Sequence, residues 1–568
     1  MKTKSEASSQ GTRMGRPLLM AAFGSIIITA SSTYVALRMS ALPWPTVFVT
    51  ILSFAFLKAF TGRKGQVDLQ EVNIAQTGMS AGAMVAGGLA FTIPALFRLG
   101  IYTPYDPNQG SIWGWMKDKY FIILILALIG AILGSVLCFL NRKKYTEGPD
   151  ALTFPIGIAA AQTIQVADKN KAQGGVLFTS LGLSALFTLL RDWKMAWPSM
   201  SFAIPSTLQT GIPLKAKPAD LGGSYQLPLG VYLSPLAMGT GFLIGLPSCL
   251  YWFGGAVISD WGIATLLPML NIIPETDVAN VTSSIAIPLL LGGGLAIVVQ
   301  ELLSMIKKAK ANQTSEMKKA LEAKRRQYYY VIIPCVVAFV LSLLVAIPAW
   351  AALMMILGTG VVFVISAHMT GATGVNPMEI LAIFLMVLVR AIVPMDAKIA
   401  IFFAAAVAVA CGYAGDLMND YKVGVILNSD PKKLLISEIV GAAVGAFVAS
   451  FAILAIIAQF GGVGEGTGLT AVQSMTLSTM LEDLAMPGLF FSSLAVGFVL
   501  TFLKIPTMLV GIGMLLHLPF SVPMVLGGLW NHFQKKEHSD RNQIIASGLL
   551  GGEGLMGTLL AILAMVLN

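Results

Sequence analysis

Apolar stretches close to the length of a membrane crossing recur along almost the whole chain, from residue 17 to residue 567. A helix needs about 20 predominantly apolar residues to cross a bilayer, and here such stretches follow one another with short polar connections. The 568-residue chain is 56% hydrophobic and 11% charged, whereas soluble domains carry about 25% charged residues. These features predict an all-α polytopic membrane protein with about 16 transmembrane helices. They argue against a soluble enzyme, a disordered regulator and a nucleic-acid-binding protein.

Clusters of lysine and arginine predict how the chain is oriented. They lie in the N-terminal tail and near residues 58–64, 142–144, 169–171, 307–326, 432–433 and 535–541. Cytoplasmic loops of membrane proteins carry an excess of these residues. With a cytoplasmic N-terminus, alternating crossings place every cluster inside, which suits a multi-pass protein of the cytoplasmic (inner) membrane. The aromatic loop 101–118 then lies outside, and the side of the C-terminus stays open.

The longest polar loop divides the chain into two parts of similar size. We expect a cytoplasmic tail at 1–16, an N-terminal transmembrane half at 17–306, a cytoplasmic loop at 307–327 and a C-terminal transmembrane half at 328–568. Short glycine-containing segments around Gln162 and Gln473 are similar, which indicates two related halves with a central site between them. Residues 151–166 are predicted to be re-entrant, because basic clusters flank them on both sides. Residues 505–530 form either two short crossings or one re-entrant hairpin.

Acidic residues inside apolar stretches are candidates for function. A charge in the hydrocarbon costs ~2.5–3.5 kcal/mol, so a retained one usually faces a cavity or a partner. Glu465 and Glu553 lie between glycines, and Glu379 follows Asn376 and a proline. These three are proton-coupling candidates, and the alternative is an ion pair or hydrogen-bonded kink that only fixes helix packing.

Other polar residues complete the set of candidates. Glu438 is a further acid in an apolar stretch. Asp416, Asp420 and Lys422 lie beside a predicted cytoplasmic loop, where a solvated helix end is the expected structure. Amide side chains in or next to apolar stretches are Asn73, Gln76, Gln162, Gln209, Asn376 and Gln473. Glycines four residues apart, at Gly130/Gly134 and Gly441/Gly445, predict close helix contacts rather than chemistry.

Motifs for catalysis or cofactors give little support to an enzyme. Gly78-Met-Ser80-Ala-Gly82 matches the string of a nucleophile elbow, but that elbow needs a preceding strand and this stretch is predicted to be helical. The chain has no ATP-binding G-x-x-x-x-G-K-[ST] loop and no H-E-x-x-H motif. Its four cysteines lack metal-ligand or disulfide spacing. We therefore expect no enzyme, no cofactor and no metal site, and any uphill transport must use an ion gradient or a separate ATPase.

Several of these stretches together resemble the oligopeptide transporter (OPT) family, which includes the yellow-stripe-like metal-chelate carriers. Gly415-Asp-Leu-Met-Asn-Asp-Tyr-Lys-Val-Gly424 resembles the family signature D-L-M-x-D-x-K-x-G, which contains Asp416, Asp420 and Lys422. Asn73-Ile-Ala-Gln-Thr-Gly-Met-Ser-Ala-Gly82 resembles a second family segment. Many members carry Glu after a Phe-Pro pair where this chain has Ile156, whereas Glu553 matches a frequent family Glu.

The resemblance implies a proton-coupled importer of small peptides, peptide-like compounds or metal chelates, with about sixteen helices in two related halves. We accordingly expect a secondary active oligopeptide transporter in the lipid bilayer, with protons and a small peptide as its partners and a possible homo-oligomeric state. Peptide termini and amides would meet the side chains of Asn73, Gln76, Gln162, Asn376 and Gln473. The alternatives are a transporter of siderophore-type metal chelates and, as a different class, a passive channel.

Overall fold

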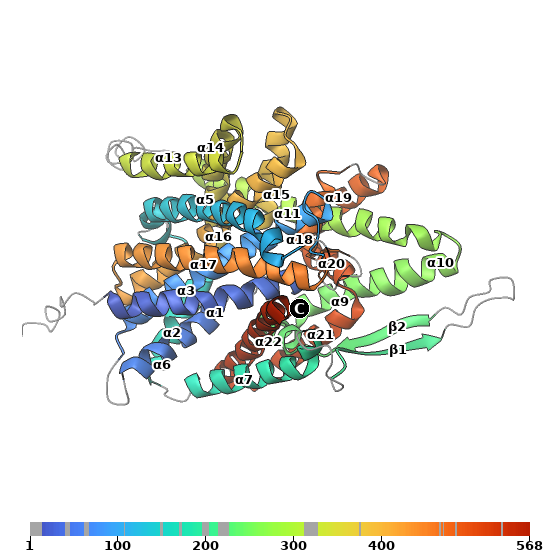
Figure 1. Cartoon of the computed structure of the whole chain (residues 1–568), viewed down its shortest axis with the longest axis horizontal. Helices are drawn as coiled ribbons and strands as arrows, with labels where there is room; N and C mark the ends of the chain where they lie inside the picture. Colours follow the sequence, from blue (N-terminus) through green and yellow to red (C-terminus); the bar gives the residue numbers. More distant parts are fainter. Residues whose placement is uncertain are drawn as a thin grey trace, which may run out of the picture.

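The structure is a computed structural model. It describes residues 14–39, 46–61, 67–106, 108, 110–147, 151–169, 173–195, 204–213, 226–311, 328–373, 376–464, 467, 469, 471–482, 486–535 and 538–567. Helices dominate this part of the chain, and many of them run side by side. Figure 1 shows α5 (Ile112–Thr146), α17 (Pro431–Gln459) and α1 (Gly15–Met39) stacked as roughly parallel rods.

The first part of the chain forms the following further elements: α2 (Thr46–Thr61), α3 (Leu69–Ala90), α4 (Pro94–Arg98), α6 (Pro155–Lys169), α7 (Gln173–Asp192), the 3-10 helix η2 (Trp193–Met195), α8 (Pro235–Ile244), α9 (Leu246–Val257), the π-helix η3 (Ile258–Leu266), α10 (Leu267–Met269), the 3-10 helix η4 (Glu275–Asp277) and α11 (Val278–Ala311). The second part forms α13 (Tyr328–Leu344), α14 (Ala349–Thr373), α15 (Met378–Ile392), α16 (Ala397–Leu427), α18 (Val472–Thr479), α19 (Pro487–Phe502), α20 (Thr507–Leu516), α21 (Leu518–Phe533) and α22 (Ser539–Leu567).

The helices confirm the predicted class, an all-α polytopic membrane protein. Within the described residues, nine helical segments are long and apolar enough to cross a bilayer, and four shorter apolar helices accompany them. The longest include Ile112–Thr146 and Ala397–Leu427. The total of about 16 crossings and the division at 307–327 stay predictions.

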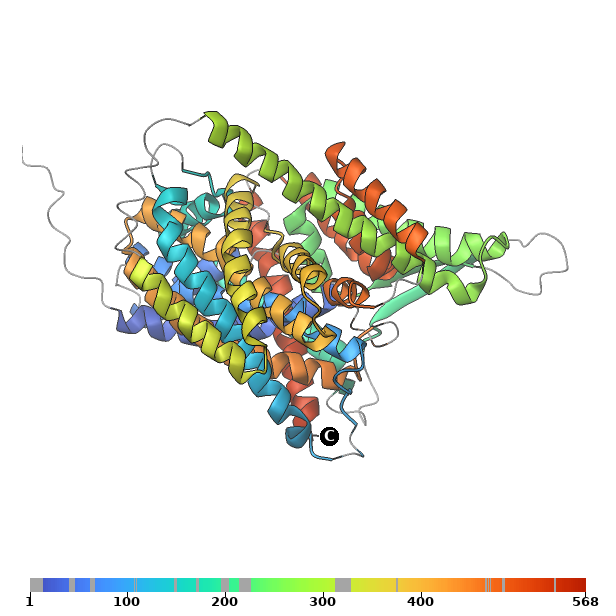
Figure 2. The same cartoon turned by 90° about the horizontal axis from the view of Figure 1, so that it is seen from above.

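A two-stranded antiparallel ribbon is the one sheet in the described part, and the sequence analysis did not expect it. Strand β1 (Thr207–Pro213) pairs with β2 (Gln226–Tyr232), with Thr207 opposite Tyr232. The ribbon lies at one end of the molecule, the same end as α10 (Figures 1 and 2). Gln209 lies exposed on β1 and not in a membrane helix, which corrects its place among the candidate amides.

Small residues let the central helices approach closely. Helix α3 packs against α1, α16 and α17, and its residues from Val72 to Ala90 are all buried. A Cβ atom at Gly441 of α17 would lie 1.7 Å from the carbonyl oxygen of Gly78 in α3, and one at Gly445 would lie 2.5 Å from the Cα of Gly82. Likewise, a Cβ at Gly130 of α5 would lie 2.5 Å from a backbone oxygen of α16. The close contacts predicted from the glycine spacing are therefore confirmed.

Two pairs of short helices meet at single-residue junctions. Gly245 joins α8 to α9 with φ +82°, and His517 joins α20 to α21 with φ +62°. The pairs pack on each other, α8 against α21 and α9 against α20. The stretch predicted as two short crossings or a hairpin thus consists of two helices that meet at His517, and α9 continues into the π-helix η3.

The contacts of α22 give its direction. Ser180 and Ser184 of α7 lie beside Gly548 and Gly552, and Ser31 and Tyr34 of α1 lie beside Gly554 and Gly557. Higher residue numbers in α22 therefore meet higher numbers in α1 and α7, so the three helices run in the same direction. The end of α22 therefore lies at the end of the bundle opposite to the start of α1.

Candidate functional site

A buried polar network joins α3 and α16 at the family-like segment. Gln76 donates a hydrogen bond from Nε2 to Oδ1 of Asp420 at 2.8 Å, and the Ser80 hydroxyl donates to Oδ2 at 3.3 Å. Thr50 of α2 donates to Oε1 of Gln76 at 2.5 Å. All four side chains are almost completely buried. Ser80 lies inside a helix and binds an acid, so the G-x-S-x-G string does not form a nucleophile elbow.

The expectation of a solvated helix end was wrong for Asp416 and Asp420. Both lie inside α16 and are 1% exposed, because α3 and α5 pack closely against this helix. Lys422 is half-buried, and its Nζ donates to the backbone oxygen of Thr146 at 3.4 Å. Proximity to a loop in the sequence did not indicate exposure here, since glycines of α3 and α5 let these helices pack closely on α16.

Glu438 of α17 is the acid that sequence reasoning named without assigning it a role. Its side chain is 0% exposed, and neither carboxyl oxygen has a hydrogen-bond partner among the described residues. The Oδ2 atom of Asp416 is likewise buried without a partner. Asp416 and Asp420 both lie close enough to interact electrostatically with Glu438. Three buried acids therefore share one region between α16 and α17.

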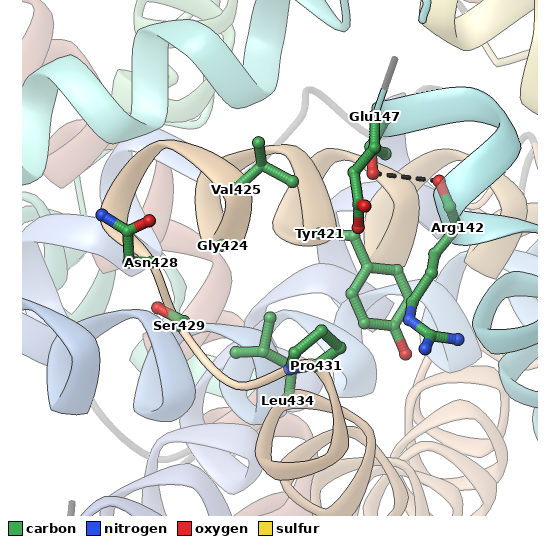
Figure 3. A pocket seen from close by; sticks show the side chains of 10 residues that line it. Arg142, Glu147, Tyr421, Gly424, Val425, Asn428, Ser429, Pro431 and Leu434 are labelled. Atoms are coloured by element: carbon green, nitrogen blue, oxygen red, sulfur yellow. Dashed lines mark hydrogen bonds between the residues drawn. The ribbon is translucent and has the colours of Figure 1, made fainter. Parts of the chain in front are cut away.

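A cavity of about 390 Å³ lies at one end of this network (Figure 3). Three segments line it: the end of α5, the end of α16 and the start of α17. The lining residues are Arg142, Thr146, Glu147, Tyr421, Gly424, Val425, Asn428, Ser429, Pro431 and Leu434. Asn73 of α3 reaches the same place and donates from Nδ2 to the Ser429 hydroxyl at 3.2 Å. Leu434 and Glu438 are four residues apart, so they lie on the same face of α17. The cavity thus approaches the acids from the end of the bundle predicted to be cytoplasmic.

Glu553 belongs to a different cluster, at the opposite end of the bundle. Its Oε1 pairs with NH2 of Arg191 in α7 at 2.9 Å. Its Oε2 accepts hydrogen bonds from the Ser234 hydroxyl at 2.9 Å and from the backbone N–H of Leu236 at 2.8 Å. Arg191 also pairs with Asp192 at 2.5 Å. Each oxygen of Glu553 is thus held by a charged or polar donor.

The remaining candidates are dispersed. Asn376 donates from Nδ2 to the backbone oxygen of Cys411 at 2.8 Å, which ties the start of α15 to α16. Glu379 lies half-buried in the first turn of α15. Gln473 is buried in the short helix α18. Glu465 and the side chain of Gln162 lie outside the described residues, although the backbone of Gln162 belongs to α6.

The segment predicted to be re-entrant begins with irregular backbone and continues as the short helix α6. Phe154, with φ +48°, donates its N–H to the backbone oxygen of Gly371 in α14 at 2.8 Å. The N–H of Gly157, in the first turn of α6, donates to Oδ1 of Asn419 at 2.8 Å. Asn419 lies between Asp416 and Asp420 in sequence, so the start of α6 is anchored beside the acids. In the described part of the chain, no three His, Cys, Asp or Glu side chains form a group suited to a metal ion.

Fold and site together define a multi-pass helical membrane protein with buried acids between its central helices. The sequence profile described as OPT oligopeptide transporter protein matches residues 16–564. The chain therefore belongs to the OPT family, a family of membrane transporters.

Two relatives are similar to this chain over different lengths. The "Putative oligopeptide transporter" of Haemophilus influenzae is 22% identical over 630 aligned positions, which cover 93% of this chain and 92% of the relative. The "Iron-phytosiderophore transporter YSL15" of Oryza sativa subsp. japonica is 26% identical over 168 positions, which cover 25% of each chain.

Proposed function

We propose that this protein is a secondary active transporter that couples proton movement to the uptake of oligopeptides or peptide-like compounds across the cytoplasmic membrane. The relative that covers 93% of this chain carries an oligopeptide transporter's name, which supports this substrate class. The observation that carries the coupling is the group of buried acids on α16 and α17.

Glu438 suits proton binding because burial without hydrogen-bond partners favours a neutral carboxyl group. An ionised carboxylate removed from water costs far more than a neutral one unless it is paired and hydrogen-bonded. Glu438 has no hydrogen-bond partner for either oxygen among the described residues, and Asp416 and Asp420 add like charges nearby. Such a group retains its proton while it is enclosed and releases it when water reaches it. We therefore assign the central coupling role to Glu438 with Asp416 and Asp420.

The cavity in Figure 3 supplies the route for release. It is lined by Tyr421, Ser429 and Leu434, and Glu438 lies one helical turn beyond Leu434. Asn73 and Gln76 link α3 to the same region through Ser429 and Asp420. Hydration of this cavity as helices α3, α16 and α17 move would open the acids to the cytoplasm. Of the predicted amides, we assign to Asn73 and Gln76 the link between substrate binding and the protonation of the acids.

The three glutamates predicted from the sequence to couple protons differ in how well their surroundings suit that role. Glu379 stays a second proton site, since it is half-buried at the start of α15. Glu465 stays a candidate without structural support. The contacts of Glu553 favour the alternative, an ion pair that fixes α22 to α7 and to the start of α8. Asn376, Gln162 and Gln473 stay candidates for substrate contacts.

The test compares accumulation with exchange in proteoliposomes. Labelled peptide uptake is measured under an imposed inward pH gradient, and counterflow is measured with peptide on both sides and no gradient. We expect Glu438→Gln to abolish accumulation and to retain counterflow, because the variant cannot exchange a proton but still binds and moves. Glu482→Gln, at an exposed acid, is the matched control and should behave as the wild type. Accumulation that ignores the gradient, or that survives Glu438→Gln, would refute the proposal.

A metal chelate is the second candidate substrate. One relative with this specificity in its name matches 25% of the chain. Chelators supply their own metal ligands, so this substrate requires no metal-binding side chains from the protein. Competition between peptide and ferric chelate in the same uptake assay separates the two classes.

A further inference from the structure

A second cavity, of about 450 Å³, lies at the end of the bundle opposite to the cavity of Figure 3. Its lining includes Arg38 at the end of α1, Glu275 before α11, and Gly464 after α17. The first cavity lies at Pro431, where α17 begins, so α17 has one cavity at each end. With the predicted orientation, this outer cavity faces the exterior. Its size falls in the range of about 300–1,000 Å³ that is typical of small-molecule sites.

The backbone around the outer cavity is irregular on three sides. Asp260 lies in the π-helix η3, His517 has φ +62° at the α20–α21 junction, and Gly464 has φ +126°. π-Helical turns occur frequently at functional sites. Non-helical backbone at membrane depth is tolerated where protein or a water-filled cavity satisfies it, and interrupted helices mark the binding sites of many transporters. Irregular backbone at three places around one cavity indicates a binding site rather than a packing defect.

The guanidinium group of Arg38 is held in place on one wall of the outer cavity. It donates a hydrogen bond to the hydroxyl of Tyr232, and its guanidinium carbon lies 5.2 Å from the ring centroid of Phe460 and 5.6 Å from that of Phe520. Aromatic faces stabilise a guanidinium group and fix its orientation. The planar fork of arginine can bind a carboxylate through two parallel hydrogen bonds. This wall of the cavity therefore suits a carboxylate group.

Acids occupy other positions on the lining. Asp260 accepts a hydrogen bond from the backbone N–H of Leu518 at 2.7 Å and contacts Nδ1 of His517 at 2.9 Å. These contacts use both oxygens of Asp260 to fix the helix junction. Glu275 lies in the exposed 3-10 helix η4 and lines the same cavity. Its carboxylate is placed to receive an ammonium group from a ligand in the cavity.

We propose that the outer cavity binds a zwitterion of small-peptide size, with Arg38 receiving its carboxylate and Glu275 its ammonium group. The proposal rests on the proposed transport function, because it locates the recognition of the same substrate class at the outer end. His517 and Asp260 act as positioning residues that hold the α20–α21 junction against the cavity.

The experiment measures equilibrium binding to the full-length protein in lipid nanodiscs without any gradient. The probes are trialanine, N-acetyl-trialanine and trialanine amide. For the wild type, blocking either terminus should weaken binding about tenfold, which corresponds to ~1.4 kcal/mol. Glu275→Gln should remove the penalty for N-acetylation and keep the penalty for amidation, and Arg38→Gln should do the reverse. Asp277→Asn, in the same 3-10 helix but outside the cavity lining, is the matched control and should bind as the wild type.

The outcomes separate this proposal from the transport proposal. Arg38 packs against several rings, so Arg38→Gln can fail to fold, and the exposed Glu275 keeps the test decisive in that case. An unchanged N-acetylation penalty in Glu275→Gln, in a protein that still accumulates peptide, would overturn the proposed site alone. The predicted binding pattern without gradient-driven accumulation would refute proton coupling and support the site. Binding of ferric nitrilotriacetate in place of trialanine would overturn the assignment to a zwitterion.

Discussion

Two buried glutamates in different regions of this protein, Glu553 and Glu438, differ in whether their carboxyl oxygens have partners. Glu553 is 2% exposed, and both of its oxygens are held, by Arg191, by Ser234 and by the N–H of Leu236. Glu438 is 0% exposed, and neither oxygen has a hydrogen-bond partner in the described chain. Burial is nearly the same for the two glutamates, but only for Glu553 do partners offset its cost.

This difference separates an acid that stabilises the structure from an acid that can bind and release a proton. Protonation of a paired buried carboxylate would break its ion pair, so such a group holds helices together. An unpaired one can change its protonation without breaking any contact. Glycine flanks and an apolar context, which drew attention to Glu553 in the sequence, therefore did not distinguish the two roles.

The largest expected effect on stability comes from breaking the ion pair between Arg191 and Glu553. Arg191→Leu removes the cation that faces Glu553 and Asp192 and leaves buried charge uncompensated. Breaking a buried ion pair in this way typically costs about 3–5 kcal/mol. Chemical unfolding in detergent micelles should show a loss of this size. The double variant Arg191→Leu/Glu553→Leu should recover part of it, and a single-variant loss below about 1 kcal/mol would contradict the structural role.

Next in size is a change at the contact between α3 and α17. Gly441→Ala places a methyl group 1.7 Å from the carbonyl oxygen of Gly78, and backbone cannot move aside as a flexible side chain can. Overpacking of this kind costs about 1–3 kcal/mol. Gly360→Ala is the matched control, because no atom lies within 4 Å of its added Cβ. If both variants unfold at the same denaturant concentration, the helices are not as close as described.

The smallest effect on stability is expected for Glu438→Gln. The substitution keeps the size of the side chain and orphans no partner, since Glu438 has no hydrogen-bond partner among the described residues. Its unfolding free energy should remain within about 1 kcal/mol of the wild type, far from the cost of breaking a buried ion pair. The same unfolding assay serves here. A loss as large as that of Arg191→Leu would show that Glu438 is paired, and the contrast between the two groups would fail.

Sequence patterns predicted the features that depend on local chemistry. Apolar length predicted the membrane helices, and the spacing of Gly441 and Gly445 predicted the contact with α3. The ribbon of β1 and β2 was missed, because a long connection between apolar stretches carried no strong alternation. The partners of Glu553 were missed for another reason. Arg191 lies 362 residues away in sequence, and a single chain gives no signal for a contact at that distance.

The sequence predicted which residues belong to the site better than it predicted where they lie relative to one another. Asn73, Gln76 and the family segment around Asp420 were named, and the structure brings all three regions together. Asn376 and Gln473 lie in other parts of the fold. Asp416 and Asp420 seemed solvated because only their distance from a loop was visible in the sequence. Their burial depends on α3 and α5, which come from distant parts of the chain.

The most direct test of the central claim is proton entry measured during transport. Proteoliposomes loaded with a pH-sensitive dye receive peptide on the outside, with no pH gradient imposed beforehand. We predict that peptide acidifies the lumen with the wild type, and that Glu438→Gln lets peptide enter by exchange without acidification. Equal acidification by the wild type and by Glu438→Gln would contradict the account.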